Sequence, residues 1–68
     1  MKIKPEHYAI LKQAVLEHLP PAPNRRQLWD AVWSAGLEAW ICDTLYPYLN
    51  DDHIDTALRN IAREGWQP

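Results

Sequence analysis

Cysteine, glycine and phenylalanine are scarce in this sequence. The 68 residues include one cysteine, Cys42, two glycines and no phenylalanine. A single cysteine excludes an internal disulfide, and no cysteines and histidines have the spacing of a zinc site. We therefore expect no metal and no cofactor. A chain this short must gain stability from dense helix packing or from self-association.

An excess of basic residues is also missing. The sequence has seven lysines and arginines against nine acids, a net charge of −2. This balance argues against broad non-specific binding of nucleic acid, which depends on neutralising phosphates. No apolar run has the length of a signal peptide or a membrane span. These features predict a cytoplasmic protein without a membrane partner.

Prolines and asparagines divide the chain into expected helices. Pro5 suits the first position of a helix, and the segment 20–23 (PPAP) ends that helix. Asn24 and Asn50 are good N-caps for the two helices that follow. We predict an all-α fold, a compact three-helix bundle in a single domain spanning 1–68, with helices at 5–19, 24–46 and 51–64.

The segment 28–49 is expected to be the centre of the bundle. It contains three of the four tryptophans, so the pattern predicts an aromatic core around it. Its later apolar residues lie on a face rotated away from the earlier ones. Either the helix is continuous and is contacted on two sides, or it breaks near Gly36. We favour a continuous helix, because residues 35, 38 and 39 are compatible with one.

The aromatic residues exceed what a core of this size needs. They therefore predict a protein interface, either with another protein or in a homodimer, since Trp and Tyr are common interface residues. The alternative is that all of them fill the core. The interface candidates are Trp29, Trp33, Trp40, Tyr46 and Tyr48. Trp66 is expected to pack against Ile61 after a C-terminal cap at Gly65.

The polar face of the expected last helix suggests a second function. Arginine, asparagine and threonine can bind base edges and phosphates, so this face resembles a helix-turn-helix reader in outline. The alternative is a solvated face in which Arg59 pairs with Asp55, and in which the arginines at 25 and 26 pair with acids of another helix. The nucleic-acid candidates are Arg25, Arg26, Thr56, Arg59, Asn60 and Arg63.

Catalysis is not indicated. His53 lies among aspartates, but its position in a first helical turn favours a capping or surface role over metal binding. Cys42 has no neighbouring base and is expected to be a buried or half-buried, inert thiol. We therefore predict that the protein is not an enzyme.

The segment Leu45 to Ile61, LYPYLNDDHIDTALRNI, resembles a stretch of small uncharacterised phage and prophage proteins. The resemblance covers about a quarter of the chain and carries no functional residue. It implies a phage-borne accessory protein that binds host proteins. Together with the aromatic residues, it favours a small protein-interaction module over a DNA-binding domain.

Overall fold

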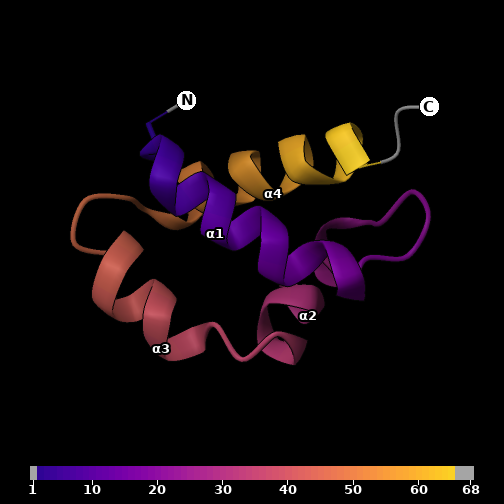
Figure 1. The fold of residues 1–68 in the computed structure, drawn as a ribbon, viewed down its shortest axis with the longest axis horizontal. Coiled ribbons are helices and arrows are strands. Elements are labelled where there is room, and N and C mark those ends of the chain that lie inside the picture. The colour runs from indigo at the N-terminus through magenta and orange to yellow at the C-terminus, as the bar shows by residue number, and fades with distance from the viewer. Residues whose placement is uncertain (1, 66–68) are drawn as a thin grey trace.

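The computed structural model describes residues 2–65, which form an all-helical fold with no strand (Figure 1). The expected all-α class is therefore confirmed. In place of three helices, the described part contains four α-helices and two short helical segments of other types. These are α1 (Pro5–Val15), the 3₁₀ segment η1 (Leu16–His18), α2 (Arg25–Ser34), α3 (Glu38–Trp40), the π-helical segment η2 (Ile41–Leu45) and α4 (Asp51–Gly65).

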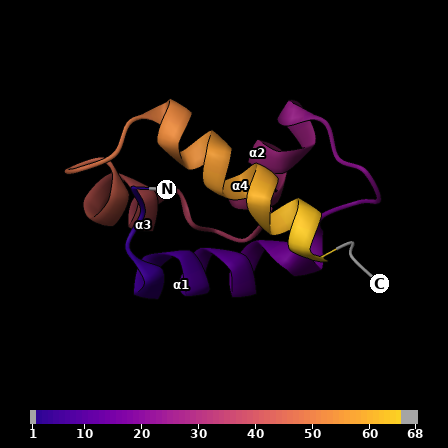
Figure 2. The ribbon, with the colours of Figure 1, turned by 90° about the horizontal axis from the view of Figure 1, so that it is seen from above.

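Helices α1 and α4 run in the same general direction, and seen from above they converge at an oblique angle toward the end of α4 (Figure 2). Helix α4 contacts α1, η1 and α2, whereas α3 and η2 lie together on the other side of the molecule from the end of α4. Glu64 joins the two long helices, because its Oε2 accepts hydrogen bonds from Tyr8 (2.9 Å) and Lys12 (3.0 Å).

The predicted helix starts are confirmed. Lys4 caps α1 and is followed by Pro5. Asn24 and Gln27 form a capping box at α2, in which each side chain bonds to the backbone of the other residue. Asn50 and His53 exchange the same pair of bonds at α4, so His53 has the predicted capping role.

The prediction of one continuous helix over 24–46 is wrong, because the chain breaks at Gly36. This residue has φ +73°, in the left-handed region that glycine enters at little cost. Its N–H donates to Trp33 O, and the N–H of Leu37 donates to Val32 O. These two bonds form a Schellman motif, which ends α2. The break redirects the chain, so that Ile41 and Leu45 reach the core.

The core is aliphatic, and α4 supplies more of it than any other element. The expected aromatic core is therefore wrong, and a bundle organised around an aromatic-rich central helix is not confirmed. Trp29 and Trp40 only pack against the core from its edge. The apolar stripe of α4 is buried, and its residues are Ile54, Ala57, Leu58, Ile61 and Ala62. The packing expected for Trp66 lies outside the described residues.

Candidate functional site

The five aromatic interface candidates fall into two separate groups. Trp29, Trp33 and Tyr46 line one open pocket. Trp40 and Tyr48 instead lie around His7, near the start of α1. The predicted set is thus not a single surface, and each group needs its own interpretation.

The pocket has a volume of about 240 Å³ and lies between α2, the end of η2 and the start of α4. The ring centroids of Trp29 and Trp33 are 5.9 Å apart, and the ring planes are inclined by 34°. Trp33 is 47% exposed and Tyr46 is 40% exposed. These fractions are high for such large side chains, which are usually mostly covered. We call this group the aromatic pocket, and its lining residues are Arg25, Trp29, Trp33, Tyr46 and Asp51.

Asp55 contacts two residues that line the aromatic pocket, Arg25 and Trp29. It is the one buried charged residue among the described residues, at 7% exposure. Its Oδ1 accepts from Trp29 Nε1 (3.3 Å) and lies 3.3 Å from Arg25 Nε, while its Oδ2 lies 2.9 Å from Arg59 Nε. Both carboxylate oxygens are therefore occupied. Because these partners come from α2 and α4, Asp55 fixes the two helices and the Trp29 ring relative to each other.

Tyr46 and Asp51 form the outer side of the pocket. The Tyr46 hydroxyl donates to Asp51 Oδ1 at 2.6 Å. This hydrogen bond, with a smaller contribution from burial, raises the pKa of Tyr46 to about 12. Within residues 2–65, Asp51 Oδ2 has no hydrogen-bonding partner. One carboxylate oxygen thus remains available at the edge of an aromatic pocket.

The second aromatic group, Trp40 and Tyr48 around His7, connects segments that are distant in the sequence. The Tyr48 hydroxyl lies 2.7 Å from His7 Nδ1 and accepts from the backbone N–H of Lys4 (3.2 Å). The Lys4 ammonium lies 5.5 Å from the centre of the Tyr48 ring, and His7 contacts the Trp40 ring edge-on. These contacts hold the start of α1 against the turn after η2, so this group has a structural role.

The nucleic-acid candidates interact with other residues of the same chain, although the arginines among them are exposed. Arg25 and Arg59 both form ion pairs with Asp55, which agrees with the alternative that these two arginines pair with acidic residues. Arg26 lies 3.9 Å from Asp30. The remaining three are all on α4: Arg63 donates to Asn60, and the Thr56 hydroxyl donates to Asp52 O.

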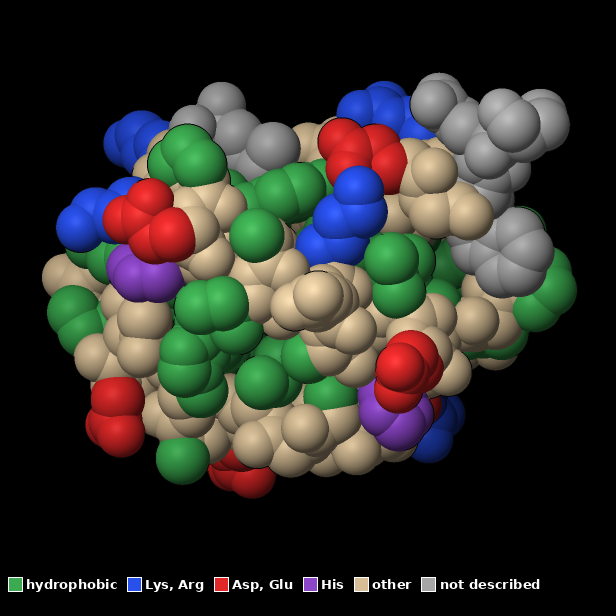
Figure 3. Space-filling model, viewed as in Figure 1, with side chains coloured by type: hydrophobic (Ala, Val, Ile, Leu, Met, Phe, Trp, Pro, Cys, Tyr) green, Lys and Arg blue, Asp and Glu red, His purple; other side chains and the backbone are tan. Residues whose placement is uncertain are grey.

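Charge is mixed over the surface. Basic and acidic side chains lie beside each other on the face seen in Figure 3, and the described part of this face has no broad basic area. Mixed charge of this kind gives weak steering of a polyanion.

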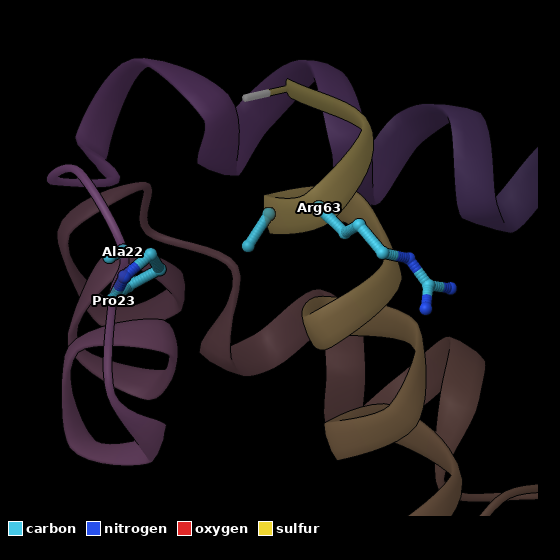
Figure 4. Close-up of a pocket in the computed structure, with 4 residues that line it drawn as sticks. Ala22, Pro23 and Arg63 are labelled. Carbon is cyan, nitrogen blue, oxygen red and sulfur yellow. The ribbon is translucent and has the colours of Figure 1, made fainter. Parts of the chain in front are cut away.

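A second hollow, of about 330 Å³, is lined by Ala22, Pro23, Ala62 and Arg63. Figure 4 shows Ala22 and Pro23 on the loop before α2, facing α4, with the Arg63 side chain pointing away from them. The lining is almost entirely apolar. It therefore offers little that could orient a polar ligand, and it is a weaker candidate than the aromatic pocket.

Sequence reasoning missed two parts of the pocket and misplaced one side chain. Asp51 and Arg25 were not associated with the aromatic residues, although the four-residue spacing of Asp51 and Asp55 marks one face of a helix. Cys42 is exposed, so the expectation of a buried or half-buried thiol is wrong. It lies in the π-helical segment, where the wider backbone turns only Ile41 and Leu45 into the core.

Residues 2–65 lack both a metal-binding cluster and a membrane-spanning helix. This part of the chain holds no group of three or more histidine, cysteine or acidic side chains arranged to bind a metal ion. It also has no helix with the length and apolar character needed to cross a bilayer.

Comparison with known proteins gives no significant match to a family model, a curated protein or a solved structure. The candidate site therefore has to be interpreted from its own geometry.

Proposed function

We propose that this protein is a non-enzymatic interaction module that binds another protein through the aromatic pocket and the exposed rings around it. The observation that carries the proposal is the exposure of Trp33, at 47%, beside Trp29 and Tyr46. Exposed tryptophans and tyrosines are costly to leave in water and are the commonest hot spots of protein interfaces.

The rigidity of the pocket also supports binding. Trp29 is fixed by its bond to Asp55, and Tyr46 is fixed by its bond to Asp51. Side chains that are held in place before binding lose less conformational entropy when a partner arrives. This pre-formed surface is therefore suited to binding a partner protein.

The resemblance of residues 45–61 to phage and prophage proteins suggests the setting. We propose a phage-derived accessory protein that acts in the cytoplasm on a host or phage protein. A reducing cytoplasm would keep the exposed thiol of Cys42 free. A second copy of the chain is a possible partner in the same proposal.

The proposal can be tested by comparing the wild-type chain with Trp33→Ala in two measurements. Sedimentation velocity over a wide concentration range detects a homodimer. Quantitative affinity capture from the native cytoplasm detects a different partner. We expect one of the two to show an association that Trp33→Ala weakens at least tenfold, as the loss of an interface hot spot does.

Ile10→Ala is the matched control. Ile10 is also a large exposed apolar residue, at 45%, but it lies on α1 and does not line the aromatic pocket. It should leave the association unchanged. An equal loss of association in both variants would indicate non-specific hydrophobic association. The absence of association in both measurements would overturn the proposal.

A second candidate is a small DNA-binding domain that uses Arg59, Asn60 and Arg63 on the exposed face of α4, with Arg25 and Arg26 on α2. The exposure of the two arginine side chains, 64% for Arg25 and 66% for Arg59, favours it. A gel shift on duplex DNA that falls with salt, and that is lost in Arg59→Ala and Arg63→Ala, would support it. The absence of any shift at low salt would eliminate it.

A further inference from the structure

We propose that the aromatic pocket binds the guanidinium group of an arginine side chain of the partner protein. This inference rests on the proposed function and names the chemistry that the partner must supply. Three properties of the pocket lead to it: its size, its aromatic walls and the distribution of its charges.

The size of the pocket favours a side chain over a free small molecule. Its volume is about 240 Å³, which is below the range of roughly 300–1,000 Å³ found for sites that enclose small ligands and cofactors. The pocket is also open to solvent on one side. An occupant attached to a protein surface can enter from that side while its backbone stays outside.

The aromatic walls favour a flat cation. The Trp29 and Trp33 rings, whose centroids are 5.9 Å apart and whose planes are inclined by 34°, line the pocket together with Tyr46. Cations are attracted to the faces of such rings, and tryptophan gives the strongest attraction. A guanidinium group can stack flat on an indole, which an ammonium group cannot do.

The pocket is lined by one acidic residue, Asp51, and one basic residue, Arg25. Asp51 lies at the edge beside Tyr46, and its Oδ2 has no partner within residues 2–65. Asp52 adds a second negative charge in the same helical turn. Asp51 Oδ2 can accept a charge-assisted hydrogen bond from a guanidinium N–H.

Arg25 also lines the pocket and shares the single charge of Asp55 with Arg59, so the part of the pocket beside Arg25 is positive. An isolated cation would be repelled there. An arginine in a peptide avoids this conflict, because a backbone carbonyl oxygen of the same peptide can accept a hydrogen bond from the exposed Arg25 guanidinium. The arrangement therefore fits an arginine together with its own backbone.

The test uses three acetylated and amidated tripeptides, Gly-X-Gly, in which X is arginine, citrulline or glutamate. Citrulline has nearly the shape of arginine without its charge. The indole N–H signals in ¹⁵N–¹H NMR spectra report on Trp29 and Trp33 directly. We expect saturable shifts with the arginine peptide, and roughly tenfold weaker binding of the citrulline peptide, since charge-assisted hydrogen bonds are about twice as strong as neutral ones.

Asp51→Asn and Asp52→Asn form a matched pair of variants. Each removes one negative charge from the first turn of α4, but only Asp51 lines the pocket. An asparagine at position 51 can still accept the Tyr46 hydrogen bond, so the pocket wall is retained. Asp51→Asn should abolish the preference for arginine over citrulline, and Asp52→Asn should keep most of it. Trp33→Ala should weaken binding of both peptides.

Three outcomes would overturn the inference: equal binding of arginine and citrulline peptides, tighter binding of the glutamate peptide, or an unchanged preference in Asp51→Asn. Tighter binding of glutamate would mean that Arg25 and the α4 N-terminus select an acidic partner. These results leave the proposed function standing if Trp33→Ala still weakens the association with the partner. If the arginine peptide binds but Trp33→Ala leaves partner association unchanged, the inference about arginine stands and the proposed function is overturned.

Discussion

The indole nitrogen of Trp29 donates a hydrogen bond to the carboxylate of Asp55 over 3.3 Å, which joins α2 to the second turn of α4. A carboxylate that is only 7% exposed is stable there because Arg25 and Arg59 neutralise it from the solvent side. Stability and the shape of the aromatic pocket therefore depend on the same side chain.

Asp55→Ala should destabilise the fold by about 2 kcal/mol. Breaking a buried ion pair costs more than this when the remaining charge is trapped. Here the two arginines are well exposed and can rehydrate, so the main loss is the acceptor of Trp29. The midpoint of thermal unfolding should fall by about 10 °C.

Asp30→Ala is the control for that prediction. Asp30 also pairs with an arginine on α2, but over 3.9 Å and with both side chains well exposed. Its replacement should change the free energy of unfolding by less than about 0.5 kcal/mol. Similar losses in the two variants would contradict the role assigned to Asp55.

The helix starts could be predicted, and the buried stripe of α4 can be recognised in the sequence, because both depend on neighbouring residues. Asn24 and Asn50 bond within their own first helical turns, and the apolar residues of α4 follow the helical repeat. The break at Gly36 was also encoded locally. The signal is a glycine followed by an apolar residue, Leu37. The sequence spacing between Leu37 and Val32 is that of the apolar contact in a Schellman motif.

The aromatic pocket could not be predicted, because it needs the relative positions of two helices. The spacing of Trp29 and Trp33 places both on one side of α2, and the spacing of Asp51 and Asp55 does the same on α4. Nothing in either spacing shows that these faces meet. The aromatic core was wrongly expected because the aliphatic residues fill the interior without help, which leaves rings with polar groups at the edge.

Gly36→Ala should destabilise the protein by about 1 kcal/mol, the cost of holding an L-residue in the left-handed region. A methyl group at this position would meet no atom within 4 Å beyond its chain neighbours, so the loss comes from backbone strain and not from a steric clash. Urea unfolding measures it. Gly36→Asn should lose less, since asparagine enters this region more readily. A gain in stability in Gly36→Ala would indicate that α2 can continue through the break.

Ala22→Gly should stabilise the protein by up to about 0.5 kcal/mol. Ala22 has φ +48°, a conformation that glycine adopts without strain, and this relief is partly offset by the greater freedom of glycine in the unfolded chain. The same change at Ala9, an exposed position within α1, should instead cost about 1 kcal/mol. Thermal unfolding of both variants provides the comparison, and a loss of stability in Ala22→Gly would refute the strain argument.

Stability should fall between pH 10 and pH 12 because of two tyrosines. Burial and a hydrogen bond to Glu64 raise the pKa of Tyr8 to about 12 from an ordinary value of 10.0, and the bond to Asp51 raises that of Tyr46 equally far. In this window the unfolded chain loses phenol protons that the folded chain keeps. The free energy of unfolding therefore decreases as pH rises, and the contribution is complete below pH 10. Urea unfolding at a series of pH values should show a shallower decrease in Tyr8→Phe and in Tyr46→Phe, and the shallowest in the double variant. An equally steep decrease in the double variant would assign the effect to other groups.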